Sequence, residues 1–363
     1  MSRFEHLDSY SIRITAKAPL FIGSGKSFTK KEYYYNTKEN TVSILNEYQL
    51  MNLIIDNGLL PHYEKFIMDK PSQYLKDFFE EWGVTIKEIE AITRYTTDVG
   101  NALMPDKSLV EIVEFIRNKE GLAYIPGSSI KGALRTALLC KMINDDNLSE
   151  KYVAYLGNKP LDAKTVESEL LNTLTLSKKK GDAVNSIMKG IIVSDSEPVP
   201  QDRMVLCRKD DMTISGNIQS LNIIRECIKP GTLIKARLTL DKSVLNRIDG
   251  SDIKSAIEEF GIYYSKQYVS KYHPPANWSA EDYSKCLILG GGTGYFSKNI
   301  VYPLLPGQSG LKYVSNLMSN KFRRHKHEQD IGLGISPKLL KCTTYNGKLY
   351  HMGVCKIDIN EEV

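Results

Sequence analysis

The sequence predicts an α+β fold built on antiparallel sheets, and three features of the chain lead to this prediction. Short runs that alternate apolar and polar residues, the period of a half-buried strand, are separated by turn-forming residues. Longer runs with helical spacing lie between them, so strands and helices are mixed along the chain. Apolar residues make up 42% and charged residues 25% of the 363 residues, a balance that excludes bulk disorder.

The N-terminal part of the chain predicts strands followed by a helical insertion. Residues 10–22 alternate and predict the first strand. A strand pair follows at about 32–45, with the turn sequence TKEN between its strands. The apolar spacing is helical in the region that we define as an insertion at about 47–98, and Pro61 and Pro71 divide it into several short helices.

The middle of the chain predicts strands around one long helix. A hairpin is expected within 109–125, and an amphipathic helix follows at 130–143. Two more helices are expected near 147–157 and 163–176. The remaining strands expected here lie at 191–195 and 204–208, with a further pair that turns at Lys229-Pro230-Gly231-Thr232 and ends in LIKARLTLD.

A polar segment at 242–252 predicts a domain boundary, since a chain of this length suits two domains at ~150 residues each. We therefore divide the chain into an N-terminal domain, 1–243, and a C-terminal domain, 244–363. The second domain is expected to hold a long helix at about 252–271 and a closing hairpin. Asn346-Gly347 forms the turn of that hairpin, because both residues tolerate positive φ.

Composition limits the class of protein further. No apolar stretch approaches the ~18 residues that span a bilayer, and the N-terminus lacks the apolar core of a signal peptide. The 6 cysteines are scattered without a C-x-x-C pair, which indicates reduced thiols. We therefore expect a cytoplasmic protein with no membrane partner. The net charge of +5 does not mark a nucleic-acid binder, so only local clusters of cations can indicate one.

The stretch IPGSSIKGALRTALL at 125–139 is the strongest candidate for a binding site. A strand ends at its Pro-Gly pair, and either of the two serines that follow can cap a helix. Two cations four residues apart share one face of that helix, so N–H groups, hydroxyls and cations meet at its start. The alternative is a well-capped core helix with incidental surface cations. The residues predicted to bind phosphate are Gly127, Ser128, Ser129, Lys131 and Arg135.

The glycine-rich stretch at 23–27, GSGKS, is a second candidate. A P-loop requires glycine five residues before Gly25, but that position is Leu20, and a strand rather than a helix follows. An NTPase is therefore not predicted. A glycine-rich loop still admits a nucleic-acid backbone at close range, with Lys26 as a contact, and the alternative is a flexible hairpin tip.

Two further clusters lie in the C-terminal half. Four glycines at 290–294 fail the dinucleotide pattern G-x-G-x-x-G, but they allow close approach of a ligand; the alternative is a tight turn. The run 321–327 is the densest positive cluster, and the alternative is a solvated surface. We predict that both clusters form a second contact surface for a polyanion, with contacts from Gly291, Gly292, Lys298, Lys321, Arg323 and Arg324.

Catalytic and metal chemistry have little support in the sequence. The chain has no G-x-S-x-G elbow and no H-E-x-x-H motif. His351 and Cys355 lie four residues apart in a predicted strand, which separates them by more than ~10 Å. We predict no catalytic residue, no metal and no cofactor.

These motifs resemble the RAMP superfamily of CRISPR-associated proteins. The superfamily signature P-G-S-S-[IL]-K-G-x-[LI]-R matches residues 126–135, and the strand with its glycine loop at 10–26 is similar too. The chain length, GGGTGYFSKN at 290–299 and the closing segment 336–359 resemble the Csm-type fifth-subunit family of type III-A effector complexes. The resemblance implies two RRM-like (ferredoxin-like) domains with antiparallel sheets and helical insertions.

The resemblance also implies a role and partners. It implies an RNA-binding subunit that caps the backbone filament at the 3′ side of the guide RNA and supports maturation of the guide 3′ end. Implied partners are the guide (CRISPR) RNA, the backbone RAMP subunit and the small helical subunit of the Csm complex. Target RNA and host maturation nucleases stay open as further partners. Contacts to phosphates suit this role, because such a subunit must accept any guide sequence.

Catalysis by this chain is not implied. The backbone paralogue cleaves target RNA with an aspartate after its first strand region, but residues 18–31 here contain neither Asp nor Glu. Two alternatives to a non-catalytic RNA-binding subunit stay open. One is a metal-independent endoribonuclease of the RAMP type with a histidine as general acid or base. The other is a protein adaptor that recruits maturation nucleases.

Overall fold

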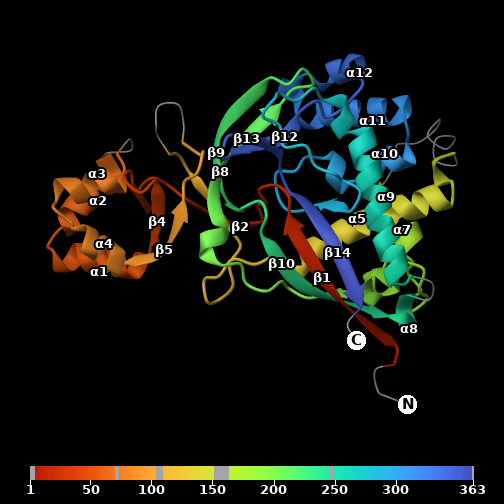
Figure 1. Cartoon of the computed structure of the whole chain (residues 1–363), viewed down its shortest axis with the longest axis horizontal. Coiled ribbons are helices and arrows are strands. Elements are labelled where there is room, and N and C mark those ends of the chain that lie inside the picture. Colours follow the sequence, from red (N-terminus) through yellow and green to blue (C-terminus); the bar gives the residue numbers. More distant parts are fainter. Residues whose placement is uncertain (1–4, 70–72, 104–108, 151–162, 246–247, 362–363) are drawn as a thin grey trace.

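The computed structural model describes residues 5–69, 73–103, 109–150, 163–245 and 248–361, and their strands form two sheets (Figure 1). Helices cover the first sheet and extend from the second. The predicted α+β class is therefore confirmed. Among the described residues, no helix is long and apolar enough to cross a membrane.

The first sheet holds a ferredoxin-like unit. Its five strands lie in the order β11–β14–β1–β10–β7, and every neighbouring pair is antiparallel. Four of its strands and two helices occur along the chain in the order β1-α5-β7-β10-α9-β14, with other elements inserted between them, which is the βαββαβ order of ferredoxin-like folds. The strands of this sheet are β1 (Leu7–Ala16), β7 (Ile191–Val193), β10 (Leu233–Asp241), β11 (Cys286–Ile288) and β14 (Val354–Glu361).

Two long helices cover one face of this sheet. In β1 the side chains of Tyr10, Ile12 and Ile14 are buried, while those between them are not, as the period of a half-buried strand requires. Helices α5 (Gly127–Asp145) and α9 (Gly250–Gln267) pack on this face and on each other (Figure 1). The carboxylate of Asp249 caps α9 by accepting two backbone N–H groups. The predicted polar boundary segment thus contains the start of α9.

The second sheet has nine strands in the order β2–β6–β9–β8–β5–β4–β3, and β12 and β13 extend it along the other half of β8. Most pairs are antiparallel, but β5 pairs with β8, and β6 with β9, in parallel. Its strands are β2 (Gly23–Phe28), β3 (Tyr33–Asn36), β4 (Thr41–Leu45), β5 (Thr93–Asp98), β6 (Ile112–Phe115), β8 (Met204–Met212), β9 (Ile218–Ile228), β12 (Leu340–Tyr345) and β13 (Lys348–His351).

A helical insertion follows β4 and projects from the rest of the molecule (Figure 1). It has its own hydrophobic cluster, in which Phe66, Phe78 and Phe79 pack with residues of β3 and β4. Helices are confirmed here, but the last residues of the predicted insertion form β5 instead. The helices are α1 (Glu47–Asp56), α2 (Leu60–Asp69), α3 (Leu75–Glu81) and α4 (Ile86–Ala91).

Shorter elements complete the described chain. The remaining α-helices are α7 (Ala163–Leu171), α8 (Lys242–Leu245), α10 (Val301–Leu304), α11 (Gln308–Lys321) and α12 (Asp330–Leu333). The 3₁₀ turns are Ala183–Asn185, Ile187–Gly190, Gln201–Arg203, Val269–Lys271, Phe296–Lys298, Arg323–His325 and His327–Gln329. The helix predicted near 147–157 lies largely outside the described residues.

The hairpin predicted around 229–232 is wrong. The strands on either side of this turn, β9 and β10, lie in different sheets. The turn itself is held by β1, because Gly231 N–H donates to the Ala16 carbonyl at 2.7 Å. A local turn sequence does not specify strand partners, and β10 pairs with β1 instead, where Ile234, Leu238 and Leu240 are buried.

Three other sequence predictions need correction at their limits. The first strand ends at Ala16. The predicted hairpin within 109–125 does turn back, with Arg117 and Ala123 paired antiparallel, but only its first strand, β6, is regular. The closing hairpin does turn at Asn346-Gly347, where both residues have positive φ, but its second strand ends at His351. The chain then crosses to the first sheet as β14. The division at residue 243 stays a prediction, and each sheet holds strands from both sides of it.

Candidate nucleic-acid interface

Helix α5, which carries the sequence signature, starts against the edge of the first sheet. A Cβ on Gly127 would lie 2.2 Å from the carbonyl oxygen of Val193 in β7, so only glycine fits at this position. The preceding residues are bonded to the chain beyond β7, where Ile125 N–H donates to the hydroxyl of Ser196 at 2.9 Å. The start of α5 is therefore positioned by packing and backbone contacts on both sides.

The predicted serine cap is wrong. Pro126 occupies the N-cap position, and Gly127 N–H donates to the carboxylate of Asp195 at 2.8 Å. A carboxylate from another segment thus takes the place that we predicted for a serine hydroxyl or a phosphate, since it suits the positive end of the helix equally well. Ser128 and Ser129 lie in the first turn and face cavities instead.

Two adjoining cavities run along the N-terminal half of α5, and we call them together the α5 groove. They measure about 390 Å³ and 530 Å³. Ser128, Gly132, Arg135 and Glu167 line both of them, so the two share a wall. The first cavity lies between α5 and the glycine cluster, and the second lies between α5, α7 and the 3₁₀ turns before β7.

Cations from four segments of the chain line the α5 groove. Arg135 is shared by both cavities, Lys298 lines the first, and Lys131 lines the second. Partial burial lowers the pKa of Lys131, and desolvation lowers the pKa of Lys298. One acidic residue, Glu167, lines the groove and forms an ion pair with Arg135. The remaining cations of the groove are Lys164 and Lys189.

The glycine cluster joins this groove rather than the basic run with which we grouped it. Gly290 and Gly291 line the first cavity beside Lys298, whose ammonium donates to the Gly290 carbonyl. Gly292 points inward: its φ is +71°, and a Cβ there would lie 2.0 Å from Nη1 of Arg225. The close approach that Gly292 allows is therefore to a half-buried arginine of β9.

The basic run lines a separate cavity of about 590 Å³, which we call the α11 pocket. Lys321 lies at the end of α11 and lines this pocket together with two lysines from strands, Lys209 of β8 and Lys341 of β12. Arg323 and Arg324 are exposed in the 3₁₀ turn that follows and do not line it. Tyr295 forms part of its wall, only three residues before Lys298 of the α5 groove.

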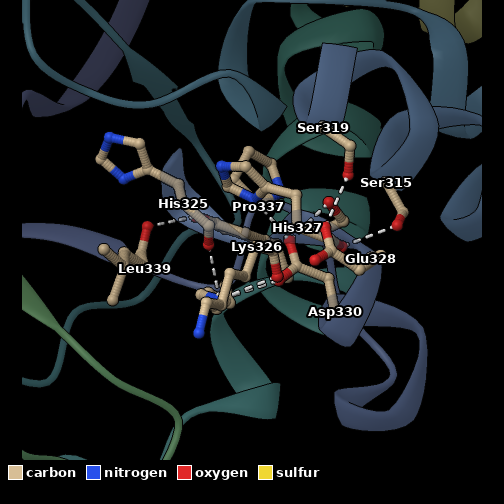
Figure 2. Close-up of polar contacts among 12 residues, drawn as sticks. Ser315, Ser319, His325, Lys326, His327, Glu328, Asp330, Pro337 and Leu339 are labelled. Carbon is tan, nitrogen blue, oxygen red and sulfur yellow. Dashed lines mark hydrogen bonds and ion pairs between the residues drawn. The ribbon is translucent and has the colours of Figure 1, made fainter. Parts of the chain in front are cut away.

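A buried carboxylate anchors the basic run (Figure 2). Asp330 is fully buried, and its Oδ2 lies 2.8 Å from both Nδ1 of His327 and the hydroxyl of Ser336. The ammonium of Lys338 lies 3.5 Å from the other carboxylate oxygen. Ser315 of α11 donates to the His327 carbonyl at 2.7 Å. The segment after α11 is therefore held in place, unlike a solvated loop.

The structure sorts the predicted contacts into three groups. Those that it brings together in the α5 groove are Ser128, Ser129, Lys131, Arg135, Gly291 and Lys298. Lys321 lies in the α11 pocket, with Arg323 and Arg324 beyond its edge. Lys26 is exposed on β2 and lines none of these three cavities, while Gly127 and Gly292 serve internal packing.

Sequence reasoning missed several residues of these cavities. Glu167 and Lys164 come from α7, and Lys189 comes from a 3₁₀ turn; each is an isolated charge in a helical stretch without a motif. In the α11 pocket, Lys209 and Lys341 occupy strand positions more than a hundred residues apart. No local pattern marks them, because pairing of β8 with β12 brings them together.

The sequence predicts no metal site, and a histidine-dependent endoribonuclease is only the alternative left open. Among the described residues, no group of three His, Cys, Asp or Glu side chains could hold a metal ion. His351 is buried between the hydroxyls of Tyr264 and Tyr283, at 3.2 and 3.1 Å. Burial lowers the pKa of His351 to about 3, so the ring stays neutral and is not suited to general acid-base chemistry.

These observations define a class of protein. Its members are two-sheet α+β proteins with a ferredoxin-like unit and a basic groove beside a helix that carries a sequence signature. The model of the RAMP superfamily matches residues 13–297, and the chain belongs to this superfamily. Proteins named CRISPR system Cms protein Csm5 are similar over nearly the whole length. The protein from Mycobacterium tuberculosis is 25% identical, with 98% of both chains covered. That of Enterococcus italicus is 22% identical, with 96% of this chain and 97% of the relative covered.

Two solved structures share the fold. A chain in the cryo-EM structure of a Csm–crRNA–target RNA ternary complex of a type III-A CRISPR-Cas system matches with a TM-score of 0.72 and 21% identity, covering 96% of this chain and all of that one. The crystal structure of T. onnurineus Csm5 matches with a TM-score of 0.65 and 20% identity, covering 95% and 99%. The predicted fold class, with ferredoxin-like domains and helical insertions, is thereby confirmed.

Proposed function

We propose that this chain is a non-catalytic RNA-binding subunit of a type III-A CRISPR Csm complex, in which the α5 groove contacts the phosphates of the guide RNA. The observation that carries the proposal is the meeting of Arg135 and Lys298 in one groove. Cations from distant parts of the chain converge there with two serine hydroxyls, and a phosphate can accept from both kinds of donor. Likeness to proteins named Csm5 over nearly the full length supports the assignment to this complex.

The groove suits contacts that do not depend on sequence. Lysine, arginine and serine side chains neutralise or donate to phosphates, but they do not require a particular base. A subunit that accepts any guide needs contacts of this kind. We propose further that the chain caps the backbone filament at the 3′ side of the guide and supports guide 3′-end maturation, with the backbone and small helical subunits as its neighbours.

A salt titration tests the groove. Fluorescence anisotropy measures binding of single-stranded RNA of two unrelated sequences to the wild type and to the double variant Arg135→Ala with Lys298→Ala. Two lost phosphate contacts should lower the magnitude of the log–log salt slope by about 1.4, at ~0.7 per contact, equally for both sequences. Lys87→Ala, an exposed lysine of α4, is the matched control. An unchanged slope together with a lower melting temperature would show that the two cations serve only the fold.

The proposed capping role needs the assembled complex. We expect complexes reconstituted without this chain, or with the double variant, to contain guides with longer and more heterogeneous 3′ ends. Guides of unchanged length would contradict the maturation role. Incubation of the pure chain with guide precursor in EDTA tests the non-catalytic part, since cleavage that a single His→Ala change abolishes would contradict it.

A further inference from the structure

The α11 pocket combines features that the proposed phosphate contacts do not use. Its walls hold three lysines, two histidines and two other aromatic side chains, and its floor is apolar. The exposed fraction of Phe322 is 44%, which is large for a phenylalanine beside a cavity. The lining residues that matter here are Lys209, Tyr295, Lys321, Phe322, His325 and Lys341.

The aromatic side chains of the pocket are grouped around Phe322. Its ring centroid lies 5.9 Å from that of His325, and the His325 ring points away from the Asp330 network (Figure 2). The ammonium of Lys321 lies 5.6 Å from the Phe322 centroid, within range of a cation–π contact. Burial raises the pKa of Tyr295 to about 12, so its hydroxyl stays neutral and can donate. Flat apolar rings beside a cation suit a flat, polar ligand.

The charges of the pocket are not balanced. The carboxylate of Asp211 is buried and forms an ion pair with Lys341 at 2.8 Å. Lys209 and Lys321 make no ion pair with any described residue. Lys209 is half-buried, and desolvation together with the nearby Lys341 and Arg225 lowers its pKa. An anion beside Lys209 would therefore stabilise its charged form.

The pocket is also rigid and close to the α5 groove. The buried Asp330 network holds the 3₁₀ turns that follow Phe322, so the backbone that carries Phe322 and His325 is fixed before a ligand binds. Tyr295 lines the pocket and Lys298 lines the groove, and the backbone N–H of Lys298 donates to the Tyr295 carbonyl at 3.1 Å. One short turn thus forms a wall of both cavities.

We propose that the α11 pocket binds one unpaired nucleotide of a single-stranded RNA, with its base stacked on Phe322, its edge against the His325 ring that stands at 74° to Phe322, and its phosphate between Lys209 and Lys321. This inference rests on the proposed function in that the strand would reach the pocket from the α5 groove, past the turn at 295–298. An acidic peptide would use the lysines, but it would leave the flat aromatic surface without a counterpart. A base with its phosphate uses both.

Mononucleotide binding tests the pocket apart from the groove. Ligand-observed NMR measures the affinity of adenosine monophosphate for the full chain. Phe322→Ala should weaken binding about five-fold or more, because stacking on one aromatic side chain is worth ~1–3 kcal/mol, whereas Phe322→Trp should retain it. Lys209→Ala should also weaken binding, and Lys87→Ala, at an exposed lysine of α4 outside the pocket, should leave it unchanged. The melting temperature of each variant checks folding.

Three results would overturn the inference. The first is adenosine monophosphate binding that Phe322→Ala does not change. The second is competition by inorganic phosphate as strong as that by the nucleotide, which would indicate an anion site only. The third is binding of a glutamate-rich peptide with the same dependence on Phe322. None of these results would touch the salt slope of the groove variants, so failure of this inference and failure of the proposed function are distinguishable.

Discussion

The α5 groove and the α11 pocket gather cations in two different ways. In the groove they lie on or beside a long helix. Two acidic residues of the same chain already bind donors there: Asp195 accepts from the Gly127 N–H, and Glu167 pairs with Arg135. In the pocket they lie at the end of α11 and on two strands, and the acid of the pocket, Asp211, is paired with Lys341. Asp330 is buried beneath the basic segment that follows α11 and anchors it. A helix supplies its own geometry, whereas an irregular basic segment needs an internal counter-charge to hold it.

The largest expected effect comes from removal of that anchor. Asp330→Ala leaves His327 and Lys338 without their buried partner and should lower the free energy of unfolding by about 3–5 kcal/mol. Asp358→Ala, which removes a half-exposed ion pair with Lys356, is the control and should cost less than about 1 kcal/mol. Urea denaturation measures both. Equal losses of unfolding free energy in the two variants would show that the basic run needs no internal anchor.

The next effect tests how the groove is held. Gly127→Ala should lower the free energy of unfolding by about 3 kcal/mol, because the new Cβ meets the Val193 carbonyl, a backbone atom that cannot turn aside. Gly132→Ala lies on the same helix with nothing within 4 Å of its Cβ, and it should stabilise by about 0.5–1 kcal/mol. A Gly127 variant as stable as the wild type would show that the start of α5 is free to move.

A fall in pH should lower the free energy of unfolding through one buried histidine. Helix α9, which packs on α5, is bonded through Tyr264 to His351, and burial lowers the pKa of His351 from 6.5 to about 3. Below pH 6.5 the unfolded chain takes up a proton that the folded chain does not, so stability falls as pH falls. The slope is about 1.4 kcal/mol per pH unit, or about 2 kcal/mol between pH 6.5 and 5. His351→Gln should remove this share of the pH dependence, and an unchanged slope would contradict it.

The smallest effect concerns the acid within the groove. Glu167→Gln frees Arg135 from its ion pair and should raise the affinity for single-stranded RNA by a few-fold, in line with the ~0.2–1 kcal/mol of an exposed pair. Glu90→Gln on α4 also removes one negative charge, but at a position that lines neither cavity of the groove, so it serves as the control. Anisotropy at fixed salt compares them. If both variants gain equally, net charge rather than the groove sets the affinity.

Sequence reasoning succeeded where the signal is local. The helix at 127–145, the insertion helices and the turn at Asn346-Gly347 follow from residue spacing and from backbone preferences within a few residues. The same reasoning failed at the start of α5, where either serine was predicted to cap the helix. Asp195 takes that role from the segment after β7, and no pattern near residue 127 contains it.

The sequence by itself determined the class of fold, the superfamily signature and most of the cations that matter. Only the tertiary structure decided that β9 and β10 part into different sheets, that β14 returns to the first strand, and that Lys298 joins Arg135 rather than Lys321. The physical reason is that helical spacing and turn geometry act over a few residues. Strand partners and cavities depend instead on which distant apolar faces bury one another best.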